Sequence, residues 1–207
     1  MPHKYLAPPN PEELGLETDA RSNKRPSGRE LPKMKKFRFQ LMADFIVEHF
    51  KPCSVADIAG GKGLLAYLLQ QRGFNCMVVD PVQQALPERY RDLSNGKRIV
   101  IPQGIAVPRI NRAFEQPMAK DFELLVGLHA HGVNIMMLDA VLRYACTAIV
   151  LPCCVIDEPN APSPGQDWFS WLVDCARRRG LITEFFSLNF KGQNVGFIVN
   201  KARVTGS

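Results

Sequence analysis

The segment SVADIAGGKG, residues 54–63, joins a short apolar run to a glycine-rich turn. The apolar run has the length and composition of a buried strand. Residues 63–73, GLLAYLLQQRG, follow with apolar positions at helical spacing, and Gly73 is suited to end that helix. The order strand, glycine turn, helix is typical of α/β proteins that bind a cofactor at the turn.

The same alternation of strand and helix continues along the chain. Residues 182–190 and 194–202 flank a short polar connection, which predicts a C-terminal hairpin. We therefore expect an α/β fold: a doubly wound, seven-stranded, mostly parallel sheet with a C-terminal antiparallel hairpin. The remaining predicted strands are residues 75–81, 97–106, 122–132 and 147–156, and the remaining predicted helices are residues 37–50, 134–146 and 167–180.

Length and composition indicate one domain plus a tail. The chain has 207 residues, of which 46% are hydrophobic and 22% charged, a globular composition. No run approaches the roughly 18 apolar residues of a membrane span, and the first residues lack the apolar core of a secretory signal. We expect a soluble, cytoplasmic protein without a membrane partner. The six cysteines lie mostly in apolar runs, which favours reduced thiols.

Basic residues are concentrated near the N-terminus. Residues 1–30 are polar and rich in proline, which predicts a flexible arm preceding a domain at residues 31–207. Residues 21–38 hold eight Lys and Arg and a single acidic residue, Glu30. Two aromatic residues, Phe37 and Phe39, lie at the end of this basic segment. Such a segment suits a phosphate backbone with stacking surfaces nearby, so RNA is the predicted partner. An ordinary solvated charge run is the alternative.

The glycine turn resembles motif I of class I S-adenosylmethionine-dependent methyltransferases. That motif is an acid followed by glycines at alternate positions, and Ala59 stands here where the first glycine is usual. The resemblance implies that Asp57 holds the ammonium group of the methionine moiety. It also implies that the turn backbone packs closely against S-adenosylmethionine, the expected cofactor, through Ala59, Gly60, Gly61 and Gly63.

A second acid ends the next strand. Asp80, followed by Pro81, is placed to accept hydrogen bonds from two ribose hydroxyls. Gly104, in the third predicted strand, and Leu128, at the end of the fourth, complete the predicted cofactor contacts.

Two other interpretations of the turn stay open. Residues 61–66 also satisfy the dinucleotide fingerprint GxGxxG/A, so a nicotinamide-dependent dehydrogenase is one alternative. The other is a tight turn in which Asp57 merely caps a helix. The acid four residues before Gly61 and the terminal hairpin favour the methyltransferase, because dehydrogenases continue with parallel units instead.

The ends of the fourth and fifth predicted strands carry a second resemblance. Leu128-His129-Ala130 with Gly132, then Asp139, then Pro152-Cys153-Cys154 is similar to a methyltransferase group that includes eukaryotic tRNA ribose 2′-O-methyltransferases. The resemblance spans about residues 33–200. It implies an RNA substrate, most naturally tRNA, methylated at a ribose hydroxyl, with Asp139 among the catalytic residues.

A ribose hydroxyl is a weak nucleophile and needs a general base or a nearby cation. His129 is the predicted base, and Lys36 or Lys35 is placed to stabilise developing oxyanion charge or to hold phosphate. The alternative for His129 is a structural hydrogen bond to a carbonyl. The predicted substrate-binding residues are Lys35, Lys36, Arg38, His131, Cys153, Cys154 and Asp157.

The cysteine pair has three interpretations. Cys153 and Cys154 continue an apolar run, which favours burial as small apolar side chains. A cysteine nucleophile is a second interpretation, and zinc held by His129, His131 and one cysteine is a third. We assign no metal, because adjacent residues seldom ligate one ion.

An adenine amino-methyltransferase is disfavoured, because the Asn/Asp-Pro-Pro-aromatic turn typical of that class does not follow the fourth strand. The favoured function is RNA methylation. A small-molecule methyltransferase is the alternative, and a noncatalytic binding module on the same fold is a third.

Overall fold

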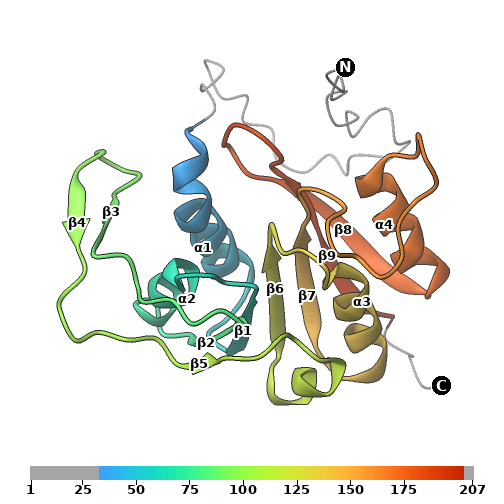
Figure 1. Ribbon diagram of the computed structural model, residues 1–207, viewed down its shortest axis with the longest axis horizontal. Coiled ribbons are helices and arrows are strands. Elements are labelled where there is room, and N and C mark those ends of the chain that lie inside the picture. Colours follow the sequence, from blue (N-terminus) through green and yellow to red (C-terminus); the bar gives the residue numbers. More distant parts are fainter. Residues whose placement is uncertain (1–32, 203–207) are drawn as a thin grey trace. The chain divides into compact units, whose positions relative to one another are not determined.

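The structure, a computed structural model, describes residues 33–202, so the arm predicted for residues 1–30 lies outside the described residues. Strands and helices alternate through much of the described chain, but β2 to β5, within residues 75–110, follow one another without a helix (Figure 1). The strands are β1 (Ser54–Ile58), β2 (Asn75–Val79), β3 (Arg89–Arg91), β4 (Arg98–Val100), β5 (Arg109–Ile110), β6 (Leu124–Leu128), β7 (Thr147–Leu151), β8 (Leu181–Ser187) and β9 (Val195–Lys201). The α-helices are α1 (Arg38–His49), α2 (Leu64–Gln70), α3 (Asn134–Arg143) and α4 (Trp168–Arg178), and the 3₁₀ helices are η1 (Lys35–Phe37) and η2 (Gln116–Asp121).

Seven of the strands form one sheet in the order β5-β2-β1-β6-β7-β9-β8. The first five run parallel, and β9 pairs antiparallel with both β7 and β8. The register places Asp57 of β1 beside Val78 and Val126 of the neighbouring strands. The predicted fold, a mostly parallel seven-stranded sheet with a C-terminal antiparallel hairpin, is confirmed.

Helices cover both faces of the sheet, as Figure 1 shows. Val55 packs with α1 and α2 in one core, whereas its neighbour Ala56 packs with α3 and α4 in the other. Because successive side chains of a strand point to opposite faces, both faces need apolar residues. This explains why β1, β6 and β7 read as continuous apolar runs. No helix within residues 33–202 combines the length and apolar character that crossing a bilayer requires.

The prediction of a sheet strand at residues 97–106 is wrong. β4 lies in that segment but pairs only with β3, in a separate two-stranded antiparallel sheet, and β5 takes the place beside β2. The turn between β3 and β4 contains Asn95-Gly96, a strong hairpin signal. The side chain of Asp92 accepts hydrogen bonds from the backbone and hydroxyl of Ser94 and so fixes that turn. Local turn chemistry therefore outweighs the apolar run that suggested a buried strand.

Candidate active site

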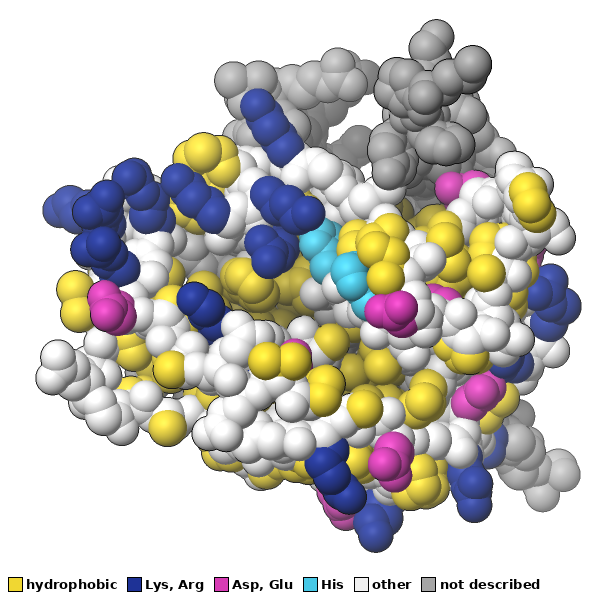
Figure 2. Space-filling view, viewed as in Figure 1, with side chains coloured by type: hydrophobic (Ala, Val, Ile, Leu, Met, Phe, Trp, Pro, Cys, Tyr) yellow, Lys and Arg dark blue, Asp and Glu magenta, His cyan; other side chains and the backbone are white. Residues whose placement is uncertain are grey.

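A cavity of about 620 Å³ lies where β1 and β6 end, between α1 and the β3–β4 hairpin. Its size is typical of a cleft for a small ligand. Figure 2 shows the hollow with Lys and Arg side chains gathered around one side and histidine side chains on the other. In an open α/β sheet, ligands bind outside the carboxyl ends of the strands, which is where this cavity lies.

The glycine turn alternates between ordinary and left-handed backbone. Ala59, Gly61 and Gly63 have φ values of 54°, 53° and 77°. Every second residue of this turn is therefore left-handed. The spacing matches the sequence motif, in which glycines stand at alternate positions after the acid. Glycine adopts this conformation freely, whereas Ala59 adopts it at a cost. Ala59, Gly60 and Gly61 line the cavity, so the strained residue lies at the candidate site.

Replacing Ala59 with glycine should raise the free energy of unfolding by up to about 1 kcal/mol. Relief of left-handed strain favours the variant, and the greater freedom of unfolded glycine offsets part of the gain. Urea unfolding of the two proteins measures the difference. Ala113→Gly is the control, because Ala113 is an exposed loop residue without positive φ, and this change should lower stability. A loss of stability in Ala59→Gly equal to that of the control would contradict the strain argument.

Gly63 has a different role from Gly60 and Gly61. A Cβ at residue 63 would lie 2.8 Å from the side chain of Val107 and 3.0 Å from that of Val78. The glycine therefore allows α2 to pack closely against its neighbours, and it does not line the cavity.

Asp57 is a buried carboxylate with one free oxygen. Its exposed fraction is 2%, it lines the cavity, and within the described residues its Oδ2 has no hydrogen-bond partner. The backbone amide of Ala66 in α2 interacts with the carboxylate, whereas the N-cap of α2 is Gly63. A Cβ at Gly60 would overlap the Asp57 carboxylate, which explains the glycine there. The free oxygen is available to a ligand in the cavity.

Burial raises the pKa of Asp57 to about 7. The hydrogen bond from Ala66 and the charge of Arg109 lower the pKa, and the charge of Asp80 raises it, but desolvation dominates. A cationic group bound at Oδ2 would favour the ionised form.

Asp80 uses both carboxylate oxygens to hold backbone. Oδ2 accepts from the Gly61 amide at 2.9 Å and Oδ1 from the Val82 amide at 2.8 Å. Each oxygen keeps a lone pair for a further donor. Arg109 fastens the same two loops by donating to the carbonyls of Gly61 at 2.9 Å and Val82 at 3.1 Å. Asp80, Pro81 and Gly104 do not line the cavity: Asp80 is buried beside it, and Gly104 lies in an exposed loop.

His129 follows β6 and lines the cavity beside Leu128. Its backbone is left-handed, with φ 57°, a second non-glycine outlier at the strand ends. Nε2 lies 2.8 Å from the carbonyl oxygen of Gln193. A carbonyl can only accept, so Nε2 carries the proton and Nδ1 is the acceptor. The structure thus contains the carbonyl hydrogen bond that was the alternative interpretation of His129.

The pKa of His129 is lowered to about 4, chiefly by burial. The positive charges of Lys35, Arg38 and His131 lower it further, while the bond to Gln193 raises it. The imidazole is therefore neutral at pH 7, the protonation state that a general base requires. A carbonyl that fixes the tautomer and orients the ring is compatible with that role.

The cavity is strongly basic. Of the described residues that line it, only Asp57 is acidic, and two aromatic residues, Phe39 and Tyr90, contribute stacking surfaces. Arg38 lies 4.2 Å from the centre of the Phe39 ring, and its Nε is buried with no partner among the described residues. The cationic lining residues are Lys36, Arg38, Lys62, Arg89, Arg91 and Arg98.

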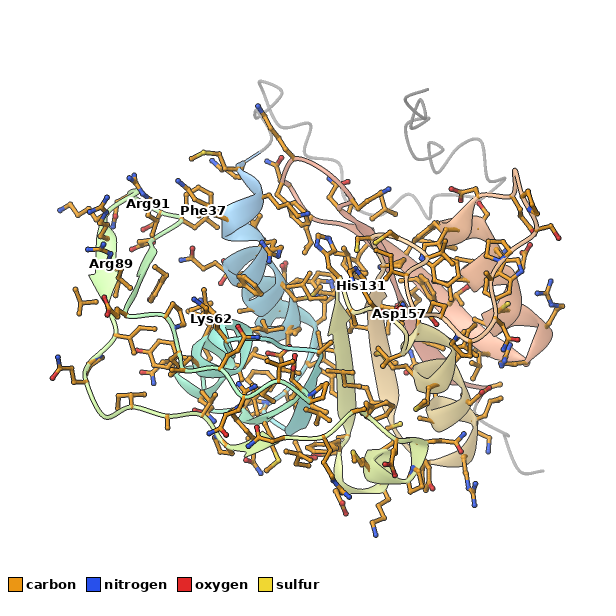
Figure 3. All side chains as sticks on the ribbon, viewed as in Figure 1. Phe37, Lys62, Arg89, Arg91, His131 and Asp157 are labelled. Atoms are coloured by element: carbon orange, nitrogen blue, oxygen red, sulfur yellow. The ribbon has the colours of Figure 1, made fainter. Side chains whose placement is uncertain are left out.

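Sequence reasoning missed four of these six cationic residues. Arg89, Arg91 and Arg98 belong to the β3–β4 hairpin, and Lys62 lies in the glycine turn. Figure 3 shows Arg89 and Arg91 together on β3 and Lys62 on the glycine turn. Arginines alternating with Tyr90, followed by Asn95-Gly96, are a signal that could have found the hairpin.

Several predicted site residues lie outside the cavity lining. Asp139 of α3 forms an ion pair with Arg179 at 2.7 Å, which ties α3 to the end of α4. Lys35 is exposed beside Lys36 and acts on His129 only through its charge. Asp157 lies in the loop after β7, and His131 lies in the loop after β6 (Figure 3). His131, Cys153 and Cys154 form a cluster of their own.

The cysteine-nucleophile interpretation finds little support in this cluster. Burial, followed by the neighbouring Cys154, raises the pKa of Cys153 to about 11. The reactive form of cysteine is the thiolate, and so high a pKa keeps the thiol protonated at neutral pH. All six cysteines of the chain are free thiols.

Comparison with solved structures addresses the fold. DesVI of Streptomyces venezuelae is similar over 81% of this chain and 93% of its own, with 11% identity and a TM-score of 0.51. At this identity the likeness concerns the fold alone. The sheet also has antiparallel β9 between β7 and β8, whereas a dehydrogenase continues with parallel units. The chain has the class I methyltransferase fold.

Two further solved structures are less similar. A ribosomal protein L11 methylase from Lactobacillus delbrueckii subsp. bulgaricus matches with 13% identity, 87% of this chain, 91% of its own and a TM-score of 0.47. Burkholderia thailandensis 1,6-didemethyltoxoflavin-N1-methyltransferase, with bound 1,6-didemethyltoxoflavin and S-adenosylhomocysteine, matches with 13% identity, 80% of this chain, 77% of its own and a TM-score of 0.47. No protein-family model matches the sequence, and no curated protein sequence matches it significantly.

Proposed function

We propose that the chain is an S-adenosylmethionine-dependent methyltransferase that methylates RNA at a ribose hydroxyl. The observation that carries the proposal is that the free Oδ2 of Asp57 and the neutral ring of His129 line one cavity. The first suits a cationic cofactor and the second suits a hydroxyl nucleophile. The class I methyltransferase fold is consistent with both.

The residues present fit S-adenosylmethionine. Asp57 Oδ2, buried and without a partner among residues 33–202, would hold the ammonium group, and the missing side chain at Gly60 leaves room beside it. The remaining lone pairs of Asp80 would accept from the ribose hydroxyls. When bound, the cofactor supplies an electrophilic methyl group.

His129 would act on the substrate hydroxyl. Nε2 is fixed by the Gln193 carbonyl, so Nδ1 would accept the hydroxyl proton as the oxygen attacks. Lys36 and Arg38 line the same cavity, where positive charge would stabilise the developing oxyanion. The low pKa of His129 disfavours the imidazolium, so the proton would pass on to solvent.

An anionic polymer is the substrate that the lining favours. The six cationic residues come from three parts of the chain: α1 with η1, the glycine turn and the β3–β4 hairpin. They therefore surround the cavity and do not form a single anion-binding subsite. Phosphates would bind the cations, and unstacked bases would pack on Tyr90 or Phe39. A ribose adjoining such phosphates would bring a hydroxyl to His129.

Transfer of labelled methyl groups tests the proposed function. The full chain is incubated with methyl-labelled S-adenosylmethionine, total RNA and, separately, a low-mass cell extract. Label should enter RNA and, after nuclease digestion, appear as 2′-O-methylnucleosides. Label confined to small molecules would support the alternative methyltransferase, label in a base would overturn the ribose assignment, and no transfer would indicate a binding module.

Neutralising the hairpin should weaken RNA binding without affecting the cofactor. Arg89→Gln, Arg91→Gln and Arg98→Gln together should lower RNA affinity and reduce the slope of log K against log salt by about 2, since each phosphate contact contributes about 0.7 on a single strand. Fluorescence anisotropy at several salt concentrations measures both. The control neutralises exposed Lys51, Arg112 and Lys120, which do not line the cavity. Equal effects of the two triple variants would contradict a role for the hairpin.

A further inference from the structure

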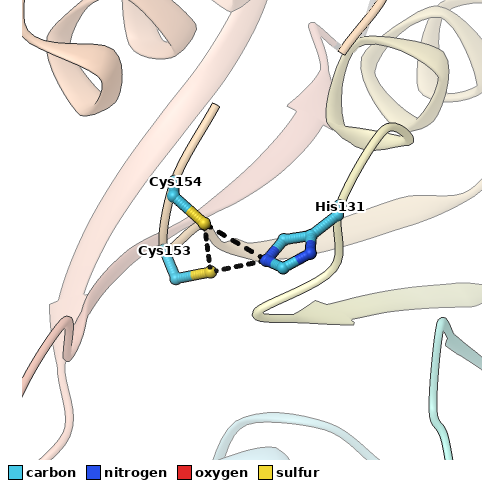
Figure 4. A group of neighbouring side chains, drawn as sticks. All are labelled: His131, Cys153 and Cys154. Carbon is cyan, nitrogen blue, oxygen red and sulfur yellow. Dashed lines mark hydrogen bonds between the residues drawn. The ribbon is translucent and has the colours of Figure 1, made fainter. Parts of the chain in front are cut away.

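Beyond the cavity lining, the loops after β6 and β7 bring together one histidine and two cysteines. Nε2 of His131 lies 3.0 Å from Sγ of Cys153 and 3.2 Å from Sγ of Cys154, and the two sulfurs are 3.2 Å apart (Figure 4). All three ligand atoms therefore lie within 4.8 Å of one another. His131 is exposed and the cysteines are partly exposed, so an ion can reach the cluster.

The backbone explains how adjacent cysteines face one partner. In an extended strand, neighbouring side chains point to opposite faces, which is why adjacent residues seldom ligate one ion. β7 ends at Leu151, however, and Pro152 to Cys154 continue as irregular backbone, in which both sulfurs lie close to His131. His129 is not part of this group, and its Nε2 is bonded to the carbonyl of Gln193 instead.

The two loops are also fastened independently of the cluster. Glu158 Oε1 accepts hydrogen bonds from the backbone and side-chain amides of Asn134, which begins α3. A Cβ at Gly132 would lie 2.9 Å from the carbonyl oxygen of Asp157. The loop carrying the cysteines is thus held against the loop carrying His131, so the ligand atoms are brought together before an ion binds.

We infer that His131 Nε2 and the thiolate sulfurs of Cys153 and Cys154 form a zinc(II) site with one open coordination position. Zinc prefers nitrogen and sulfur ligands at about 2.0–2.1 and 2.3 Å, which in tetrahedral geometry places ligand atoms about 3.5–3.8 Å apart. The three atoms need to separate by only about half an ångström. Within residues 33–202 no fourth His, Cys, Asp or Glu joins the group, which leaves that position for water or a substrate oxygen.

Binding replaces the two thiol protons, which leave to solvent as the thiolate–zinc bonds form. The ion joins the loop after β6 to the loop after β7, two residues from His129. This site does not rest on methyl transfer and can be tested separately from it.

Protection from alkylation tests the site on the unaltered chain. The reduced, metal-stripped protein is treated with iodoacetamide with and without one equivalent of zinc, and each cysteine is followed by peptide mass spectrometry. Zinc should slow alkylation of both Cys153 and Cys154 at least tenfold and leave the partly exposed Cys53 unchanged. Protection of one cysteine or neither would overturn the three-ligand site.

Affinity measurements with ligand variants complete the test. Competition against a chromophoric chelator should give one zinc per chain, and His131→Ala should weaken zinc binding at least 100-fold. The control is His49→Ala, since His49 is exposed on α1 and bonds only its own helix carbonyl at Phe45. In the wild-type chain cobalt(II) should show thiolate charge-transfer absorption. Unchanged affinity in His131→Ala, or cobalt binding without that absorption, would exclude the site.

Discussion

Asp57→Asn should bind S-adenosylmethionine about 10- to 100-fold more weakly than the wild type while its ligand-free form becomes more stable at pH 8. The weaker binding reflects loss of a charged hydrogen bond, which contributes about 1.5–3 kcal/mol. The greater stability follows from removing a buried charge. Asparagine keeps an oxygen that can accept from the Ala66 amide. Calorimetric titration and urea unfolding measure the two effects.

The pH dependence of stability provides the sharper measurement. The pKa of Asp57 is raised from 3.8 to about 7 in the folded protein, so the folded state binds more protons than the unfolded state between these values. This contribution to stability is present below about pH 4 and is lost as pH rises through about 7, a fall of up to about 4 kcal/mol. Asp57→Asn lacks this fall, whereas Asp121→Asn, at an exposed carboxylate, should retain it. Parallel stability curves for wild type and Asp57→Asn would contradict a raised pKa.

The affinity for the cofactor should change with the ionisation of Asp57. The ionised carboxylate attracts the ammonium group, so wild-type affinity should rise with pH through about 7, and Asp57→Asn should lack this rise. A rise that persists in the variant would assign the titration to another group.

His129→Ala should lower the rate of methyl transfer about 100-fold and leave cofactor affinity within twofold of the wild type. General bases contribute about 10²- to 10⁴-fold, and a base with so low a pKa belongs at the lower end. A single-turnover assay with saturating cofactor isolates this step. His49→Ala controls for the loss of a histidine elsewhere, and a fully active His129→Ala protein would remove His129 from the reaction.

The pH profile separates His129 from an ordinary histidine. Its pKa of about 4 means that the neutral base is present at all pH values above about 5. The rate at saturating cofactor should therefore be level between pH 5.5 and 8, whereas a histidine of pKa 6.5 would halve the rate near that pH. A midpoint near 6.5 would show that burial does not depress the pKa of His129 during turnover.

The sequence predicts the sheet and the cofactor side of the site because both depend on local patterns. Continuous apolar runs identify β1, β6 and β7, and parallel strands necessarily bring their carboxyl ends to one edge. Asp57 and His129 could therefore be placed at a common site before any coordinates. Their placement as cavity-lining residues agrees with that reasoning.

The rest of the site depends on contacts that residue type does not reveal. The Gln193 group that orients His129 is a backbone carbonyl, which any residue would supply. Asp139 pairs with Arg179 because α3 packs on α4. No local sequence pattern shows which residues of two packed helices will meet. The chain leaves β7 before Cys153 and Cys154, so strand alternation does not apply to them, and both sulfurs lie near His131.

The β3–β4 hairpin can evolve independently of the sheet. Its strands pair only with each other, and Tyr90 packs against the core beneath α1 and α2. Changes at exposed Arg89, Arg91 and Arg98 therefore leave the hydrogen-bonded ladder of the seven strands untouched. Residues 89–100 can thus be treated as an interchangeable module. Grafting a hairpin of another charge onto the same scaffold offers a route to new substrate selectivity with the cofactor side retained.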